Sequence, residues 1–342
     1  MLAVSSLHEL DRHETSPRHP ESALRLQAAW AGLLAAELGD AIALVEPRFA
    51  TREEIERVHT DAYIGQIEAM CISGGGELDP DTRVSPGSWN TARLAIGAGL
   101  ALVESVERGE ASAGLALVRP PGHHALADRA MGFCVFNNIA VVARSLTARG
   151  ERVLIVDWDV HHGNGTQAIF WNDPNVLFVS SQLSEHWPFS GNVTETGGPE
   201  SPGGTINLPF PEGTTGDVFL RAYDTIVAQA IDRFKPTWTL VSAGFDSHRD
   251  DPLGGLGLSA GDYALMTQRL AAVTPKHTIL FLEGGYNLTS TALSVGATAA
   301  ALVDHSYKTE APTNAGPGTQ TIEAATAAHA AAMATAPAIA PE

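Results

Sequence analysis

Basic residues are scarce in this 342-residue chain, in which 21 lysines and arginines stand against 39 aspartates and glutamates, for a formal net charge of −18. A chain this acidic repels the phosphate backbone of nucleic acids, and it contains no segment rich in lysine and arginine. We therefore expect no nucleic-acid partner. The negative field would favour a cationic substrate, although an excess of acid serves solubility in most proteins.

Cysteine and long apolar runs are also lacking. Cys71 and Cys134 are the two cysteines and lie far apart, which excludes a disulfide framework and is typical of a reducing compartment. The N-terminus has no basic segment followed by an apolar stretch of the secretory kind, and no uncharged apolar run reaches about eighteen residues. We expect a cytoplasmic protein without a membrane partner.

The chain does contain enough apolar residues, 44% of the total, to bury one large core. Short apolar runs typical of strands alternate with helical patterns at 21–38, 86–108, 137–149, 216–234, 259–273 and 288–303. This alternation predicts an α/β fold with a parallel sheet and crossover helices. We expect one domain over 1–306, whereas 307–342, rich in alanine, proline and threonine, should form a tail or a peripheral helix.

The most informative segment follows the apolar run 153–156, which suits a strand buried on both faces of a sheet. Asp157, Asp159, His161 and His162 come directly after it, where open α/β sheets bind their ligands. Asp159 and His161 are two positions apart and point the same way if the chain stays extended. A helix N-terminus would explain one acid but not two acids and two imidazoles together. The segment therefore predicts a metal or catalytic site.

A second cluster repeats this arrangement. The apolar run 115–118 leads into Arg119-Pro120-Pro121-Gly122, and this rigid turn is followed by His123 and His124. Imidazole is the side chain that titrates near neutral pH, so adjacent histidines on a stiff turn suit proton transfer. An isolated pair could be a loop feature without a role, but a second histidine pair at another strand end argues against that interpretation.

Two further strand ends add a carboxylate and a phenol. The run 239–243 precedes Asp246, and the run 278–282 precedes Glu283 and a glycine pair that presents Tyr286 on a sharp turn. Taken alone, Asp246 could cap a helix and Tyr286 could be a core aromatic. Four strand ends that carry related chemistry favour one shared site.

Asp159, His161 and Asp246 would give a metal three protein ligands and leave a position open for water, which is the catalytic pattern for zinc. An amide is a poor electrophile and water a poor nucleophile, and such a metal can activate both. Cys134 lies near this site in the sequence and could be a nucleophile. A small buried thiol is the simpler interpretation, because the histidines and the metal already supply a mechanism.

Five motifs in order resemble the histone deacetylase superfamily, most closely its class II and bacterial amidohydrolase branch, which includes acetylpolyamine amidohydrolases. They are RPPGHHA (119–125), GFCVFNN (132–138), DWDVHHGNGT (157–166), SAGFDSHRDDPLGG (242–255) and LEGGYN (282–287). The resemblance extends over roughly 8–306. It implies a single-domain arginase/deacetylase-like α/β fold, with an eight-stranded, mostly parallel sheet between helical layers. It also implies zinc-assisted removal of acyl groups from amines, usually acyl-lysine or a polyamine.

The resemblance assigns a role to each member of the histidine pair. His123 would pair with Asp157 and act electrostatically, while His124 would pair with Asn164. An aspartate at 164 would hold the second imidazole as a cation, whereas Asn164 orients His124 without adding charge. His124 is then freer to act as base toward water and as acid toward the leaving amine. Tyr286 would donate its hydroxyl to the developing oxyanion, and a tyrosine there argues for an active deacetylase.

The resemblance also implies a narrow substrate channel and a second cation. Aromatic walls at Phe133 and Trp187 would suit a methylene chain, with Leu253 near the mouth and Gly285 beside the acyl pocket. A potassium ion would bind behind the zinc. Its expected ligands are Asp157, Asp159, the His161 carbonyl, and Ser180 and Ser181, which follow the predicted strand 176–179.

Several alternatives stay open. An acetylpolyamine deacetylase would carry an acid at the channel mouth, where this chain has Leu253 after Asp251-Pro252. A binuclear manganese ureohydrolase would need carboxylates at 163 and 248, which are Gly163 and His248. A non-catalytic acyl-lysine binding module would not need Tyr286 and the histidine pair. The sequence also leaves open ferrous iron in place of zinc, homo-oligomer formation, and the choice between acylated lysine peptides and small acylated amines.

Overall fold

The centre of the molecule is one sheet of eight strands, seen in a computed structural model that describes residues 1–307 and 310–335. Every pair of neighbouring strands in it is parallel, in the order β2-β1-β5-β10-β9-β6-β7-β8. The strands are β1 (Leu2–Ser6), β2 (Ile42–Leu44), β5 (Ala113–Leu117), β6 (Val153–Asp157), β7 (Val176–Leu183), β8 (Thr205–Phe210), β9 (Trp238–Ala243) and β10 (Thr278–Leu282). A separate small hairpin pairs β3 (Gly76–Glu77) with β4 (Arg83–Val84).

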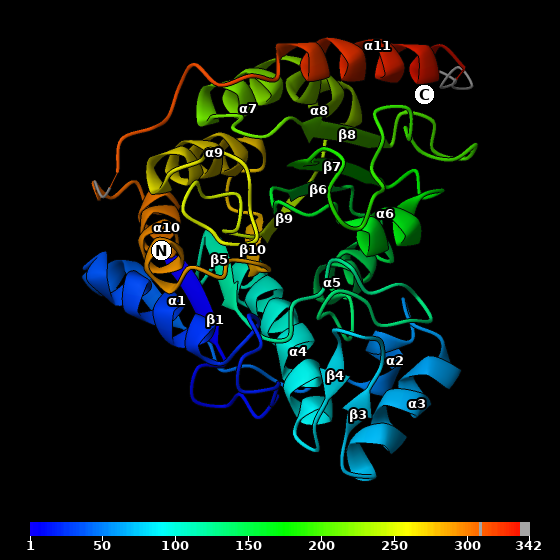
Figure 1. Ribbon diagram of the computed structural model, residues 1–342, viewed down its shortest axis with the longest axis vertical. Helices are drawn as coiled ribbons and strands as arrows, with labels where there is room; N and C mark the ends of the chain where they lie inside the picture. Colours follow the sequence, from blue (N-terminus) through cyan, green and yellow to red (C-terminus); the bar gives the residue numbers. More distant parts are fainter. Residues whose placement is uncertain (308–309, 336–342) are drawn as a thin grey trace.

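Helices cover both faces of this sheet (Figure 1). On one face α4, α5 and α6 contact the strands, and on the other α1, α9 and α10 pack together beside α7. The helices are α1 (Leu24–Ala35), α2 (Arg52–Ile55), α3 (Asp61–Ile72), α4 (Ser88–Glu107), α5 (Asn138–Thr147), α6 (Asn164–Phe170), α7 (Gly216–Ala222), α8 (Ala228–Phe234), α9 (Ala260–Val273), α10 (Leu288–Ala301) and α11 (Thr319–Thr335). A short 3₁₀ turn, η1 (Gly39–Ala41), precedes β2, and a π-helical turn, η2 (Tyr223–Val227), joins α7 to α8.

The central strands are buried along their whole length, because helices cover both faces of the sheet. All residues of β5, β6, β9 and β10 are buried, as their continuous apolar runs predict. Asparagine caps then start the helices that follow two of the site motifs. The side chain of Asn137 accepts from the Ala140 N–H at the start of α5, and that of Asn287 accepts from Thr289 and Ser290 at the start of α10. These caps determine where each motif ends.

The predicted fold class is confirmed, and the six predicted helical stretches correspond to α1, α4, α5, α7 to α8, α9 and α10. Periodicity did not reveal β1, β2, β8 or α3. The predicted end of the strand at 179 was wrong, because β7 continues to Leu183 and contains both Ser180 and Ser181. In the predicted tail, α11 packs against β8, while 308–309 and 336–342 lie outside the described residues.

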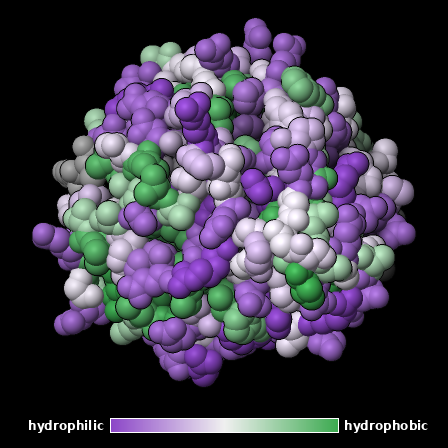
Figure 2. Space-filling model, turned by 60° about the horizontal axis from the view of Figure 1, so that its bottom comes forward, coloured by the Kyte–Doolittle hydropathy of each residue, from purple (hydrophilic) through white to green (hydrophobic). Residues whose placement is uncertain are grey.

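The face of the molecule shown in Figure 2 is mostly polar. On the face shown in Figure 2, hydrophobic residues form scattered patches separated by hydrophilic ones. The large apolar side chains with the highest exposed fractions include Leu44, Ile72 and Phe189, which come from separate parts of the sequence. Within residues 1–307 and 310–335, no helix combines the length and the apolar character needed to span a bilayer.

Candidate active site

The predicted site residues meet at the carboxyl edge of the sheet. The four strands β5, β10, β9 and β6 are consecutive neighbours there, so the loops that follow them converge (Figure 1). Polar groups that lie more than a hundred residues apart in the sequence thereby become neighbours. This is the edge at which open α/β sheets place their ligands.

Asp159, His161 and Asp246 form a set of donors suited to a metal ion. Their ligating atoms all lie within 4.8 Å of one another, with His161 Nδ1 3.0 Å from Asp159 Oδ1 and 3.3 Å from Asp246 Oδ2. Both carboxylates are fully buried, and Asp246 Oδ2 has no hydrogen-bond partner among the described residues. An orphaned, buried carboxylate oxygen that faces an imidazole nitrogen fits a bound divalent cation.

Backbone groups orient these carboxylates. The Val160 N–H donates to Asp246 Oδ1 at 2.8 Å, and the Gly284 N–H donates to Asp159 Oδ2 at 2.8 Å. A Cβ atom at Gly284 would lie 1.9 Å from Asp246 Oδ2 and 2.6 Å from Asp159 Oδ2. Glycine is therefore required at 284, because any side chain there would displace both carboxylates.

The electrostatics of the donor set reflect an excess of buried negative charge. Burial would lower the pKa of His161, but the neighbouring carboxylates of Asp159 and Asp246 raise it to about 10. Burial raises the pKa of Asp246 to about 7, and the neighbouring Asp159 carboxylate adds to that rise. Two carboxylates this close ionise together only with a positive charge between them, which a metal ion would provide.

The adjacent histidines His123 and His124 have different partners. The Nδ1 of His123 lies 2.8 Å from Asp157 Oδ2, whereas the Nδ1 of His124 lies 2.7 Å from Asn164 Oδ1. Burial opposes protonation of His123, but the carboxylates of Asp157 and Asp159 hold its pKa well above the usual value. Burial, together with the charges of His123 and His161, lowers the pKa of His124 well below its usual value. One imidazole is thus a cation and its neighbour is neutral.

Tyr286 lies on a loop that two other side chains hold in place. The Tyr286 and Asn287 N–H groups donate to Asp251 Oδ2 at 2.7 and 3.0 Å. The buried Arg25 guanidinium donates to the carbonyls of Glu283 and Gly285, and it lies 5.1 Å from the centre of the Tyr286 ring. Burial raises the pKa of Tyr286 well above its usual value, so its hydroxyl keeps its proton as a donor.

A pocket of about 370 Å³ leads to these groups. Phe133 and Trp187 both line it, and the Trp187 ring stands edge-on to His124 with centroids 4.7 Å apart. The lining residues are Asp81, His124, Gly132, Phe133, His161, His186, Trp187, Pro252, Leu253, Gly254 and Tyr286. Of the four predicted channel residues, Gly285 is outside this lining. It is buried beside Phe245 and Thr291, with its carbonyl bound by Arg25.

Two of the residues predicted to bind potassium are neighbours across β6 and β7, whereas the side chain of Ser181 points to the opposite face of β7 from that of Ser180. Asp157 and Ser180 are register partners on β6 and β7. The hydroxyls of Ser180 and Ser181 are buried, and neither has a hydrogen-bond partner in the described part of the chain. Buried oxygens without partners beside a carboxylate fit a hard cation.

Sequence reasoning missed several residues that support the site. Glu283 is part of the LEGGYN motif but has no predicted role. In the structure its carboxylate accepts from the Gly122 N–H at 2.7 Å and from the His123 N–H at 3.2 Å. Asp251 has no predicted role and only precedes Leu253, the position tied to polyamine specificity, yet its carboxylate holds the Tyr286 loop. Arg25 lies inside a helical pattern, and no local signal distinguishes it from a surface arginine.

The fold and the site together define an α/β protein with a buried carboxylate–imidazole centre that could hold a metal ion. A family model described as the histone deacetylase domain matches residues 19–302. A "Probable deacetylase" from Archaeoglobus fulgidus is 38% identical over 287 residues, which cover 81% of this chain and 79% of the relative. The "Histone deacetylase-like amidohydrolase" of Pseudomonas aeruginosa is 39% identical over 246 residues, covering 70% and 64% of the two chains.

A solved structure agrees with these relatives. The crystal structure of the "HDA15 HD domain" matches with a TM-score of 0.88 and 33% identity, covering 97% of both chains. This protein belongs to the histone deacetylase family, and its relatives indicate a deacetylase or amidohydrolase.

Proposed function

We propose that this protein is a zinc-dependent amidohydrolase that removes acetyl or longer acyl groups from amines such as the ε-amine of acyl-lysine. One observation carries the proposal: an aromatic-lined pocket is bounded by His124, Tyr286 and His161, and His161 belongs to the buried donor set that Asp159 and Asp246 complete. When held by the donor set, zinc, or ferrous iron in its place, would supply a Lewis acid for the acyl carbonyl and the attacking water.

His124 is the proposed proton carrier. Its Nδ1 donates to Asn164 Oδ1, which leaves Nε2 as the acceptor on a side chain that lines the pocket. In the first step Nε2 takes a proton from the attacking water, and in the second it returns that proton to the leaving amine nitrogen. His123, bound to Asp157, contributes a fixed positive charge nearby.

Tyr286 completes the reaction centre. Its hydroxyl keeps its proton and lies on the pocket wall, where it can donate a hydrogen bond to the oxygen that becomes negative as water attacks. Phe133 and Trp187 would enclose the methylene chain of the substrate and keep bulk water out. We also propose a structural potassium ion at Asp157, Asp159, the His161 carbonyl, Ser180 and Ser181, supported by the unpartnered hydroxyl of Ser180, the register partner of Asp157.

The alternatives have less support. Asp251 accepts from Leu253, Tyr286 and Asn287, so it is engaged in backbone hydrogen bonds and is not an open acid for a polyamine. His248 is buried and bound to Glu310 at 2.8 Å, and Gly163 offers no ligand, which disfavours a ureohydrolase with a second metal beside the first. Asp81 lines the pocket and could attract a cationic substrate, so acetylpolyamines are included among the substrates to be assayed.

A metal-replacement assay tests the proposal. The purified protein would be stripped with a chelator, reloaded with Zn²⁺, Fe²⁺ or Mn²⁺, and assayed on an acetyl-lysine fluorogenic peptide, longer acyl-lysines and acetylpolyamines. We expect hydrolysis of an acylated amine that the chelator abolishes and Zn²⁺ restores. Failure of every reloaded form on every acylated amine, or guanidinium hydrolysis with Mn²⁺, would contradict the proposal.

A further inference from the structure

Residues 310–318, which we call the strap, lie between α10 and α11 and run past α9 and α7 (Figure 1). The family model matches residues 19–302, so the strap lies outside the matched segment. Its contacts with the rest of the protein are therefore not implied by membership of the family. One of these contacts reaches the loop that carries Asp246.

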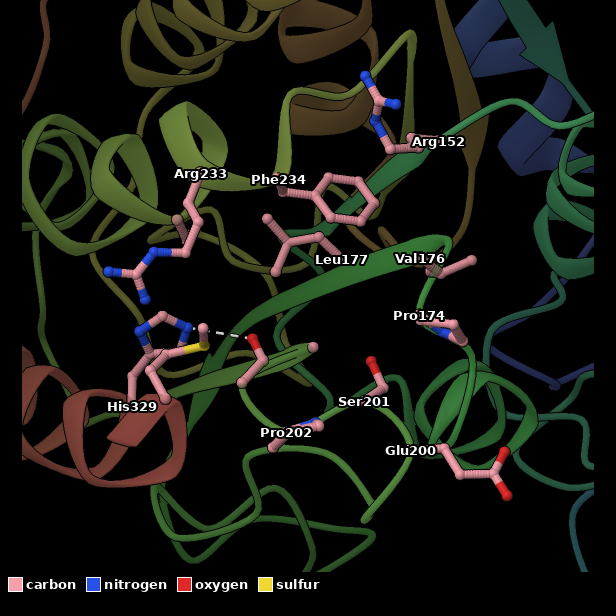
Figure 3. A pocket seen from close by; sticks show the side chains of 14 residues that line it. Arg152, Pro174, Val176, Leu177, Glu200, Ser201, Pro202, Arg233, Phe234 and His329 are labelled. Carbon is pink, nitrogen blue, oxygen red and sulfur yellow. Dashed lines mark hydrogen bonds between the residues drawn. The ribbon is translucent and has the colours of Figure 1, made fainter. Parts of the chain in front are cut away.

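The strap is attached at its middle and through α11. The Thr313 hydroxyl donates to Asp262 Oδ2 of α9 at 2.7 Å and accepts from the Gly216 N–H of α7 at 2.9 Å. Beyond it, α11 covers a pocket of about 310 Å³, where His329 Nε2 donates to the Gly203 carbonyl at 3.1 Å (Figure 3). None of these five residues belongs to the predicted active site.

At the beginning of the strap, Glu310 accepts hydrogen bonds from two other elements. Its Oε2 accepts from His248 Nε2 at 2.8 Å and from the Ala260 N–H, at the start of α9, at 2.9 Å. Its Oε1 accepts from the Arg249 guanidinium. The side chain of His248 is only 1% exposed, so its Nε2–H depends on Glu310, and not on water, for an acceptor. One carboxylate thus joins the strap to α9 and to the loop after β9.

His248 lies between two carboxylates of the site on this loop. Asp246, the predicted metal ligand, is two residues before it, and Asp251, which holds the Tyr286 loop, is three residues after it. The His248 ring is bonded at both nitrogens, because the Asp250 N–H donates to its Nδ1 at 3.1 Å. This pattern places the ring proton on Nε2 and leaves the imidazole neutral. A ring held on both sides fixes the backbone that carries it.

A metal ion is a second explanation for this cluster, because donor atoms of His248, Asp250 and Glu310 lie within 4.8 Å of one another. Three observations argue against it. The Arg249 guanidinium already supplies a positive charge to Glu310. The Asp250 carboxylate is 61% exposed and lies 3.8 Å from His248 Nδ1, and that nitrogen already accepts a backbone N–H. The cluster is therefore complete as a set of hydrogen bonds.

We propose that Glu310 is a positioning residue for the active site, acting through His248 on the metal ligand Asp246. Without this carboxylate the buried Nε2–H of His248 loses its acceptor, and the side chain has to shift to find another. Asp246 lies on the same short loop, so its carboxylate moves out of register with Asp159 and His161. This role rests on the proposed function, because it concerns the metal that these three residues would hold.

Zinc titration of the chelator-stripped protein tests this role, together with kinetics of the reloaded enzyme on the acylated amine that it hydrolyses. Glu310→Ala should weaken zinc binding by about tenfold or more, since residues behind a metal ligand usually contribute about 10–100-fold, and kcat should fall while KM changes little. His248→Ala should have the same effect. The double variant should lose little more than either single variant, because both remove one interaction. Glu310→Gln keeps an acceptor oxygen for His248 and should bind zinc nearly as the parent does.

Two variants in the same part of the chain serve as controls. Thr313→Ala loosens the strap at α9 and α7, so it should lower the melting temperature and leave zinc affinity and kcat unchanged. Glu323→Ala removes the same charge from an exposed position of α11 and should change none of the three. If Glu310→Ala fails to fold, the comparison of His248→Ala with Thr313→Ala replaces it.

The outcomes separate this role from the proposed function. If the parent binds zinc and hydrolyses an acylated amine, three results would overturn the role of Glu310 alone: parental zinc affinity in Glu310→Ala, an equal loss of zinc affinity in Thr313→Ala, or additive losses in the double variant. A parent that neither binds zinc nor hydrolyses an acylated amine would contradict the proposed function as well.

Discussion

At the scale of single residues, Asn164 decides how two adjacent and otherwise similar histidines differ. Both imidazoles are buried and their ring centroids are 3.9 Å apart. The carboxylates beside His123 raise its pKa, whereas burial and the charge of His123 lower the pKa of His124, whose partner Asn164 adds no negative charge to oppose them. Two like charges at this separation would repel strongly, so a neutral partner for one of them is the stable arrangement.

This difference predicts unequal mutants. His124→Ala should remove essentially all activity on an acetamide but spare far more on a trifluoroacetyl substrate, whose electrophilic carbonyl needs less help from a base. His123→Ala should cost less on the acetamide and differ less between the two substrates. Steady-state kinetics on both substrates gives the comparison, and equal losses throughout would mean that the pair acts as one unit.

A second residue prediction concerns the Tyr286 hydroxyl. Tyr286→Phe should lower kcat by about 10²–10³, the usual loss for one oxyanion donor, while KM changes little. The ring and its contact with Arg25 stay in place, so the melting temperature should change little. Unchanged turnover would show that another group stabilises the oxyanion.

The donor set predicts one tightly bound divalent metal per chain. Asp246→Ala should abolish both metal retention and hydrolysis, because it removes the carboxylate whose Oδ2 faces His161 Nδ1 at 3.3 Å. Elemental analysis of the parent and the variant measures this directly. Two tightly bound transition metals per parent chain would contradict the assignment of a single catalytic metal.

At the scale of elements, the loop after β10 depends on a carboxylate from the loop after β9. Asp251 accepts backbone hydrogen bonds from Leu253, Tyr286 and Asn287, and its side chain joins the two loops on either side of the pocket. Its neighbour Asp250 has an exposed side chain, and only its backbone carbonyl contacts Asn287. The two aspartates therefore form a matched pair for mutation.

Asp251→Ala should lower kcat by about tenfold or more and destabilise the fold by roughly 1–3 kcal/mol, because three partly buried N–H groups lose their acceptor. Asp250→Ala should leave both nearly unchanged. Chemical denaturation and steady-state kinetics of the two variants measure these effects. Parental kcat in Asp251→Ala would show that the loop holds Tyr286 without this carboxylate.

At the scale of the whole molecule, a buried charge cluster joins the N-terminal segment to the core behind the site. Arg119 binds Asp11 and Glu21, with its Nη2 2.7 Å from Glu21 Oε2, and Arg25 Nη1 lies 3.1 Å from Glu21 Oε1. Burial would raise the pKa of Glu21, but the two arginines lower it to about 2. A buried network of this kind makes stability depend on pH.

The sign of this dependence follows from the lowered pKa. Glu21 binds its proton more weakly in the folded chain than in the unfolded chain, so its stabilising effect is present above about pH 4.5 and is lost as the pH falls toward 2. The full shift corresponds to about 3 kcal/mol. Denaturation between pH 7 and 2 should show this loss, and Glu21→Gln should be less stable at pH 7 with a shallower acid slope. If the stability of Glu21→Gln fell with pH as steeply as that of the parent, other groups would be responsible for the loss of stability in acid.

Local sequence determined the parts of this protein that depend on near neighbours. Continuous apolar runs marked the buried strands, alternation with amphipathic stretches predicted the α/β class, and motifs at strand ends marked Asp159, His161 and Asp246 as candidate ligands. These predictions succeeded because a buried strand, a cap or a tight turn is determined by residues a few positions apart.

Only the tertiary structure decided the contacts between distant segments. Arg25 reaches the carbonyl of Gly285 across 260 positions, which also explains why Gly285 lies behind the pocket and not in its wall. No local sequence pattern indicates that Ser180 lies inside β7, that Asp251 holds the Tyr286 loop, or that a pocket lies beneath α11. The physical reason is that side-chain partners are set by the order of strands in the sheet and by helix packing, which periodicity along the chain does not encode.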